Sequence, residues 1–476
     1  MKRLFQNNLF VFLLIVAFGI LYKTLYLDYA GLWHDEAFNM YFSQQHWGHL
    51  KHISEWNCNP PMYYYFLWIW EHLFGTREYA VRFSSVLFSA LSGGMVYLLC
   101  ARHLNRTSGW IAALFYCVSN QMFFFSHEVR PYALMIFLVL CSSLLFLEMI
   151  RKPGWVKATA LGVVNFGIVY LNYQAGIIVL LQLVMLLFHR DGGFLRFFAM
   201  AFGVTVLFSV LRFTPKTLAL LVLKDPNAVS PQLHQLPEIW YGFFNGPDLF
   251  FVFLFAVLVI LVYLIRNKEW KPLFRSERIS LIYVWTMGMG ATFVFFFLGY
   301  FSSLFMTDVV VFAAPFVFIS FAWFFDKADL NIRYPLLALA SVFILFSSLR
   351  LDLRTLKPMD YRGATELVKS LQRNGGACLV ETRDLEALFS YYYDKSIFSN
   401  FGSVKDRLKE KRIFLVNNVE EAQSADLTSV NQVILTQTYE KFNPDNAALE
   451  KYLSENFRKH VSTGFYRGVT ITLYSK

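Results

Sequence analysis

The sequence LFVFLLIVAFGILYKTLYL, residues 9–27, decides the fold of this chain. It carries one charge, Lys23 near its end, and a helix of this length crosses the roughly 30 Å hydrocarbon core of a bilayer. The basic start MKR resembles a secretion signal, but no small-residue cleavage site follows, so we interpret the run as a retained anchor. The segment LWHDEA, residues 32–37, comes shortly afterwards and brings Asp35 and Glu36 close to the membrane.

The composition excludes an ordinary soluble domain. Hydrophobic residues make up 56% of the chain and charged residues only 16%, and apolar runs recur as far as residue 350. Residues 351–476 hold 18 Lys/Arg and 16 Asp/Glu, with no run long enough to span a bilayer. We therefore predict a polytopic α-helical membrane region, residues 1–350, followed by a smaller domain, residues 351–476.

The net charge of +10 comes mainly from the membrane region, where 25 basic residues face 17 acidic ones. Membrane topology explains such an excess better than nucleic-acid binding, so we expect the bilayer and no nucleic acid as a partner. About eleven transmembrane helices are predicted, at residues 9–27, 82–101, 110–125, 132–150, 158–171, 176–188, 194–213, 249–265, 279–299, 304–325 and 334–349. The run 158–188 is too long for one span and is therefore divided around residues 172–174.

The loop charges predict the orientation. With the N-terminus in the cytoplasm, every short internal connection is basic, as the positive-inside rule requires. An odd number of spans then places the C-terminal domain outside the cytoplasm. The same orientation gathers the unusual polar segments on that face: the first outer loop at 28–81, and residues 126–132, 172–174 and 214–247. We therefore expect an active site on the non-cytoplasmic surface.

The first outer loop is too long to be a simple connector. Residues 46–53 combine aromatic and basic side chains that suit an interfacial helix, and MYYYFLWIW, residues 62–70, returns as an aromatic belt at headgroup depth. The loop is therefore predicted to lie along the membrane and hold a lipid-borne substrate beside the carboxylates. His46, His49 and His52 could share one helix side as zinc ligands, but a wet polar face is the favoured interpretation because no fourth ligand is evident.

Four short motifs follow one another in the first third of the chain: Asp35-Glu36, Pro60-Pro61-Met62-Tyr63-Tyr64, Arg82-Phe83-Ser84-Ser85 and Glu128-Val129-Arg130-Pro131-Tyr132. Together and in this order they resemble the GT-C glycosyltransferases, in particular the bacterial relatives of protein O-mannosyltransferases and aminoarabinose transferases in glycosyltransferase family 39. Two positions depart from the family pattern. Asn59 stands where a His commonly precedes the prolines, and Thr307-Asp308 lies near the place of a late Arg-Tyr pair. These departures leave the sugar and the acceptor open.

The resemblance implies an inverting hexosyl- or pentosyltransferase in the inner (plasma) membrane of a bacterium. Its donor would be a polyprenyl-phosphate sugar, and its acceptor a hydroxyl of a glycan, lipid or protein. Asp35 would be the base for that hydroxyl. Adjacent residues on a helix point in different directions, so Glu36 would orient Asp35, bind the acceptor or help to hold a divalent metal ion.

The departing phosphate requires a cation, and the planar fork of Arg130 suits it. Glu128 would orient Arg130 or bind a metal ion, and His127 is a further phosphate or metal candidate. The remaining candidates would line the substrate site: Pro60, Pro61, Tyr63, Tyr64, Arg82, Tyr132 and Tyr173.

Structural alternatives stay open for most of these residues. Asp35 and Glu36 could be solvated charges at a helix end, and Glu128 and Arg130 could form an ion pair that closes a turn. His127 is also typical of a membrane interface, and residues 172–174 could form only a tight turn.

The C-terminal domain is predicted to be α/β. Short apolar runs at 377–381, 413–417, 432–436 and 469–474 alternate with amphipathic stretches such as 403–412 and 444–457. The domain has no Gly-rich phosphate loop and no nucleophile elbow, so we interpret it as an acceptor-binding domain or a cover over the membrane site.

Two other functions compete with transfer. A transporter or flippase of a lipid-linked sugar should show polar residues at mid-membrane and internal repeats, whereas charges deep in the spans are few and no convincing repeat is present. A non-catalytic scaffold acting through the outer domain should lose its function on truncation at Leu351.

Overall fold

The computed structural model describes the chain except residues 1–5, 51–59, 190, 211–230, 267–276, 302–307, 351–358, 373–374, 382–384, 400–401, 426, 428–429, 439–445 and 466–467. Its contacts form two compact units. The helical unit comprises Met1–Tyr26, Lys51–Tyr63 and Arg82–Leu351, and the sheet unit comprises Leu27–Leu50, Tyr64–Val81 and Asp352–Lys476. Most of the predicted first outer loop therefore groups with the C-terminal domain, while the predicted division at residue 350 stays a prediction.

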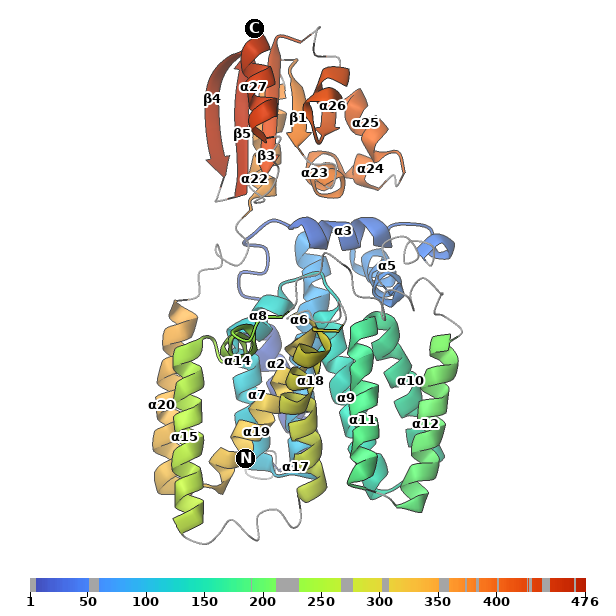
Figure 1. The fold of residues 1–476 in the computed structure, drawn as a ribbon, viewed down its shortest axis with the longest axis vertical. Coiled ribbons are helices and arrows are strands. Elements are labelled where there is room, and N and C mark those ends of the chain that lie inside the picture. The colour runs from blue at the N-terminus through green and yellow to red at the C-terminus, as the bar shows by residue number, and fades with distance from the viewer. Residues whose placement is uncertain are drawn as a thin grey trace. The chain divides into compact units, whose positions relative to one another are not determined.

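The helical unit is built almost entirely from helices (Figure 1). They are α2 (Asn8–Lys23), α6 (Glu78–His103, from Arg82 onward), α7 (Arg106–Val118), α8 (Asn120–Ser126), α9 (Tyr132–Arg151), α10 (Trp155–Leu171), α11 (Ile177–Val184), α12 (Gly192–Val210), α14 (Gln235–Phe243), α15 (Pro247–Arg266), α17 (Arg278–Trp285), α18 (Ala291–Leu298), α19 (Ala314–Lys327) and α20 (Leu330–Leu349). A π-helical turn, Thr286–Gly290, joins α17 to α18, and the 3₁₀ helix η5 (Val309–Ala313) leads into α19.

Every predicted span contains helix in the described part of the chain. Seven helical segments are long and apolar enough to cross a membrane: Glu78–His103, Tyr132–Arg151, Gly192–Val210, Pro247–Arg266, Arg278–Leu298, Val309–Lys327 and Leu330–Leu349. Asn8–Lys23, Trp155–Leu171 and Tyr173–Leu187 are shorter apolar helices. The predicted span 110–125 is broken at Ser119, which separates α7 from α8.

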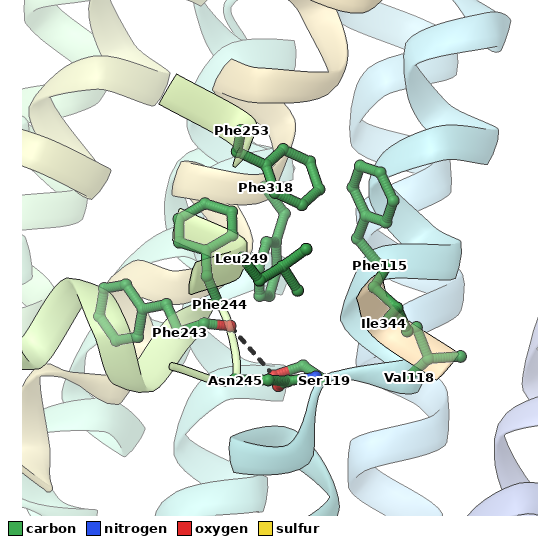
Figure 2. Close-up of a pocket in the computed structure, with 10 residues that line it drawn as sticks. All are labelled: Phe115, Val118, Ser119, Phe243, Phe244, Asn245, Leu249, Phe253, Phe318 and Ile344. Atoms are coloured by element: carbon green, nitrogen blue, oxygen red, sulfur yellow. Dashed lines mark hydrogen bonds between the residues drawn. The ribbon is translucent and has the colours of Figure 1, made fainter. Parts of the chain in front are cut away.

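The break at Ser119 is stabilised by hydrogen bonds to other parts of the helical unit, made by the Ser119 hydroxyl and the Asn120 amide. The Ser119 hydroxyl donates to the carbonyl of Phe243 at 3.3 Å, as Figure 2 shows. The side chain of Asn245 accepts from the Asn120 amide at 2.6 Å and donates to the Ser347 hydroxyl at 3.1 Å. The cavity beside this junction measures about 10 Å³, roughly the space of one water molecule, so these helices are closely packed.

A neutral polar network ties α9, α10, α11 and α17 together inside the helical unit. Ser142 donates to Asn165 at 2.6 Å, Asn165 to Gln182 at 2.9 Å, and Gln182 back to Ser142 at 2.8 Å. Tyr283 donates to Ser143 at 2.9 Å. Hydrogen bonds between membrane helices stabilise their association, and here none of the five side chains brings a charge into the apolar interior.

Close packing of α10 against α12 depends on one glycine. A Cβ atom at Gly162 would lie 2.7 Å from the carbonyl oxygen of Ala201 and 2.8 Å from the Cβ of Val204. The hydroxyl of Thr205 donates to the Gly162 carbonyl at 3.2 Å across the same contact. Small residues allow membrane helices to approach in this way, which increases their van der Waals contact.

The sheet unit contains the loop helices and the C-terminal α/β domain. Its helices are α3 (His34–Ser43), the 3₁₀ helix η1 (Trp47–His49), α5 (Met62–Phe74, from Tyr64 onward), α22 (Tyr361–Gln372), α23 (Glu386–Tyr393), α24 (Lys395–Phe398), α25 (Val404–Glu410), α26 (Val419–Ser424) and α27 (Asn446–Asn456). Its strands are β1 (Ala377–Glu381), β2 (Ile413–Val416), β3 (Gln432–Thr438), β4 (Arg458–Phe465) and β5 (Val469–Ser475).

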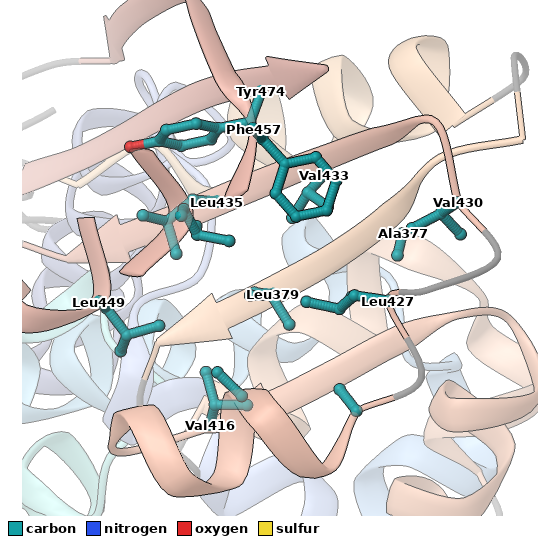
Figure 3. Close-up of a cluster of buried hydrophobic side chains, with 13 residues drawn as sticks. Ala377, Leu379, Val416, Leu427, Val430, Val433, Leu435, Leu449, Phe457 and Tyr474 are labelled. Carbon is teal, nitrogen blue, oxygen red and sulfur yellow. The ribbon is translucent and has the colours of Figure 1, made fainter. Parts of the chain in front are cut away.

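The five strands form one sheet in the order β2-β1-β3-β5-β4. β1 pairs in parallel with β2 and β3, whereas β5 is antiparallel to β3 and β4. Leu379 of β1 and its partner Leu435 of β3 point to one face, where they belong to a buried cluster with Leu449 of α27 (Figure 3). Leu453 of α27 belongs to the same cluster. The four predicted strands are present. β4 is an additional strand that the sequence analysis did not predict.

Candidate active site

The acidic pair lies at the start of α3, and the helix gives its two carboxylates different environments. The Asp35 side chain is 37% exposed and lies 3.2 Å from the Nδ1 atom of His34. Glu36 is fully buried, and its Oε2 atom accepts from the backbone amide of Trp33 at 3.2 Å. Glu36 thus caps its own helix, while Asp35 remains accessible in the first turn, where the helix dipole favours a negative charge.

A second carboxylate, Glu71, supports the other end of α3. Its Oε1 atom accepts from the Ser43 hydroxyl at 3.0 Å, and the same hydroxyl lies 2.8 Å from the carbonyl of Met40. Burial raises the pKa of the Glu71 carboxyl to about 8, and the hydrogen bond from Ser43 opposes part of this shift. The sequence analysis did not identify Glu71, although a single carboxylate within the aromatic run of α5 was a usable signal.

The predicted motif 128–132 is anchored in the helical unit by its main chain. The Ser85 hydroxyl of α6 donates to the carbonyl of Glu128 at 2.6 Å. Arg82, which belongs to the same motif as Ser85, is 1% exposed, and Glu128 is also 1% exposed. Two of the four sequence motifs, 82–85 and 128–132, therefore meet in space.

Arg130 forms an ion pair that the sequence did not reveal. Its guanidinium lies 3.6 Å from the Asp308 carboxylate and 4.8 Å from the centre of the Tyr132 ring. The Tyr132 hydroxyl donates to the same carboxylate at 3.5 Å. Asp308 is 42% exposed and Arg130 is 18% exposed, so solvent and solutes reach this group. Arg130, Tyr132 and Asp308 thus form a partly open cationic and aromatic cluster, named here the Arg130 cluster.

His127 is held by main-chain carbonyls on both ring nitrogens. Nδ1 lies 2.9 Å from the carbonyl of Phe123, and Nε2 lies 3.0 Å from the carbonyl of Leu25. The ring also packs against that of Phe123, with 4.2 Å between centroids. This environment favours the structural alternative for His127, and its predicted role toward phosphate or metal stays a prediction.

The other predicted substrate-lining residues are distributed over both units. Pro61 is buried immediately before α5 and Pro60 is half-buried. Tyr63 and Tyr64 are almost fully buried. Tyr173 opens a short 3₁₀ helix whose N-cap, Asn172, accepts from the amides of residues 174 and 175 at 2.9 and 3.2 Å. Residues 172–174 therefore form a capped turn, while a substrate contact by Tyr173 stays a prediction.

Within the residues that the structure describes, no three His, Cys, Asp or Glu side chains gather in a metal-binding arrangement. His46 is the N-cap of η1 and His49 its last residue, with 5.7 Å between their ring centroids, and His52 lies outside the described residues. The predicted candidates thus form two sets. Asp35 and Glu36 belong to the sheet unit, and the Arg130 cluster with Arg82 and Glu128 belongs to the helical unit.

Comparison with known proteins identifies the fold. Residues 58–215 match the family model described as dolichyl-phosphate-mannose-protein mannosyltransferase. ArnT from Cupriavidus metallidurans in the apo state is similar over 97% of this chain and 97% of its own, with a TM-score of 0.63 and 13% sequence identity. The same protein bound to undecaprenyl phosphate gives a TM-score of 0.61 with the same identity and coverage.

A more distant likeness is the archaeal oligosaccharyltransferase AglB from Archaeoglobus fulgidus, in complex with an inhibitory peptide and a dolichol-phosphate. It covers 89% of this chain and 69% of its own, with a TM-score of 0.52 and 10% identity. No curated protein matches the chain at a significant level. The predicted resemblance and fold class are confirmed, because the chain has the GT-C fold of these glycosyltransferases with a small sheet-containing C-terminal region.

Proposed function

We propose that this chain is an inverting membrane glycosyltransferase that moves a hexosyl or pentosyl group from a polyprenyl-phosphate donor to an acceptor hydroxyl. The contrast between Asp35 and Glu36 carries the proposal. One carboxylate caps its helix and is buried, while its neighbour is accessible at the helix start. The matched family and the polyprenyl phosphates bound in the ArnT and AglB structures support the donor class.

In this reaction Asp35 acts as the general base. It removes the proton of the acceptor hydroxyl as the oxygen attacks the anomeric carbon. The bond from that carbon to the phosphate oxygen breaks in the same displacement, so the configuration inverts and polyprenyl phosphate leaves with the bonding electrons. Glu36 fixes the first turn of α3 through the Trp33 amide, which keeps the adjacent Asp35 in place.

Arg130 is the proposed group for the donor phosphate. A guanidinium can bind two phosphate oxygens at once, and this one is held between Tyr132 and Asp308. Because Asp308 is anionic and already pairs with Arg130, a phosphate competes with it for the guanidinium.

Asp35→Asn tests the proposal. Membranes from a deletion strain receive the purified variant, and mass spectrometry follows transfer onto envelope lipids and glycans. Loss of a general base lowers the rate about 10²- to 10⁴-fold. Asp248→Asn is the matched control, because it makes the same change in an exposed aspartate of the first turn of another helix, α15. Full transfer by Asp35→Asn contradicts the assignment of the base.

Arg130→Ala tests the phosphate site with undecaprenyl phosphate as the probe. Removing a charged hydrogen-bond donor should weaken binding about ten- to hundredfold. Asp308→Asn should instead tighten binding, because it removes the competing carboxylate. An unchanged affinity of Arg130→Ala for undecaprenyl phosphate rules out the proposed role of Arg130 in binding the phosphate.

The proposed orientation places the Asp35 loop and the C-terminal domain outside the cytoplasm of a bacterial inner membrane. It rests on the basic internal loops of the sequence. To test the orientation, a single cysteine replaces Asp28 in one variant and Arg266 in another. Intact cells are then treated with a thiol reagent that does not cross the membrane. Only the cysteine at residue 28 should react, and the reverse pattern contradicts the orientation.

A further inference from the structure

The segment that leads into α3 is bound by a side chain from the C-terminal domain, 360 residues further along the chain. The backbone amide of Leu32 donates to the hydroxyl oxygen of Tyr392 on α23. Gly31 fits against the same hydroxyl, since a Cβ atom there would lie 2.9 Å from it. This contact lies three residues before Asp35, and Leu32 is fully buried.

Arg362 on α22 makes the second contact with the loop. Its guanidinium donates to the carbonyl oxygen of Asp28 at 3.3 and 3.4 Å. It also forms an ion pair with Glu78, the first residue of α6. Arg362 also interacts with Tyr392, so the two side chains of the C-terminal domain act on residues 28–32 as one connected group.

A third set of contacts involves Thr76 and Tyr41. The Tyr391 hydroxyl donates to the carbonyl of Thr76 at 2.8 Å, and its ring packs against Phe398 with 5.2 Å between centroids. Phe398 in turn packs against Tyr41 of α3 at 5.7 Å. Helices α22, α23 and α24 therefore contact the loop at three places: before α3, on α3 itself and just before α6.

We propose that the C-terminal domain is a positioning element of the catalytic loop, in which Tyr392 and Arg362 fix residues 28–32 and thereby the direction of Asp35. This inference rests on the proposed function for the role of Asp35. It assigns the domain a part in turnover that does not require it to bind the acceptor.

Hydrogen–deuterium exchange of the full-length protein tests the contact without any substrate. Tyr392→Phe removes the acceptor of the Leu32 amide, so the peptide covering residues 28–36 should exchange about three- to tenfold faster. Tyr393→Phe is the matched control, because this neighbouring tyrosine packs against Phe389 and Lys369 within the domain. Unchanged exchange in Tyr392→Phe overturns the proposal.

Gly31→Ala adds a test that depends on geometry. The new methyl group would collide with the Tyr392 hydroxyl, so this variant should also exchange faster at residues 28–36. Combined with Tyr392→Phe, which removes that hydroxyl, the second substitution should have a smaller effect than in the wild type. Effects that simply add contradict a direct contact.

The catalytic consequence is measured as the rate of transfer and, separately, as the affinity for undecaprenyl phosphate. Tyr392→Phe should slow turnover about three- to tenfold and leave the affinity unchanged, because the phosphate site lies in other residues. Faster exchange with unaltered turnover overturns the positioning role. If Asp35→Asn retains transfer, the proposed role of Asp35 fails, and the exchange result still decides whether the domain holds the loop.

Discussion

Glu71 predicts an unusual dependence of stability on pH. Its carboxyl is 7% exposed, accepts one hydrogen bond from Ser43, and has its pKa raised from 4.5 to about 8 by burial. The folded protein therefore binds a proton at Glu71 that the unfolded chain releases above about pH 4.5. The free energy of unfolding gains a contribution that is fully present below that pH. It falls as the pH rises and is lost above about pH 8.

The magnitude follows from the two pKa values. Each unit of difference corresponds to 1.36 kcal/mol, so the contribution of Glu71 changes by on the order of 5 kcal/mol across the window from pH 4.5 to 8. Glu71→Gln keeps the shape and a hydrogen-bond acceptor for Ser43 but cannot ionise. The variant should therefore become more stable relative to the wild type as the pH rises.

Thermal unfolding of the full-length protein in detergent, followed between pH 5 and 9, measures this difference. The wild-type midpoint should fall relative to Glu71→Gln over that range, because other titrating groups affect both proteins equally. Glu455→Gln, an exposed glutamate on α27, is the matched control and should track the wild type. A constant difference between the wild type and Glu71→Gln at every pH, or one of opposite sign, refutes the reasoning.

Three further predictions concern the helical unit. Lys23 is fully buried, and among the described residues its ammonium has no hydrogen-bond partner. Lys23→Met should therefore raise the midpoint of thermal unfolding, and a lower midpoint contradicts this prediction. Asn165→Leu leaves the side-chain oxygen of Gln182 without its donor and the Ser142 hydroxyl without its acceptor. The substitution should cost about 1–3 kcal/mol, measured as a lower midpoint in detergent, and an unchanged midpoint shows that the network is not stabilising. Gly162→Val should force α10 away from Ala201 and reduce expression and the midpoint strongly, whereas Gly203→Val, on an open surface, should not.

The length of the apolar runs made the membrane region predictable from the sequence. Long apolar segments with basic internal connections leave few alternatives to a helical bundle, and each predicted span contains helix in the described residues. The break at Ser119 was missed although the polar residues 119–121 interrupt the apolar run and Ser119 caps α8, because its partners at Phe243 and Asn245 are distant in sequence. Likewise β4, with the polar sequence RKHVSTGF, shows no apolar run and is defined by its pairing with β5.

The candidate site was predictable in its residues but not in their partners. Order and spacing of four motifs indicated the fold, which the comparisons confirm, while the residue roles stay predictions. The pairing of Arg130 with Asp308 connects residues 178 positions apart and has no local signal. The cap formed by Glu36 was equally hidden, because Trp33 at the N-cap is not a residue from which such a cap is expected.

The bond between Leu32 and Tyr392 also constrains how the protein forms. Its partners are 360 residues apart, so the loop leaves the ribosome long before the domain that fixes it. Contacts of such sequence separation form late, after the closure entropy of the intervening chain has been overcome. Throughout synthesis of the helical unit, residues 28–32 therefore lack their final support. Full activity should therefore appear only after the C-terminal domain has folded.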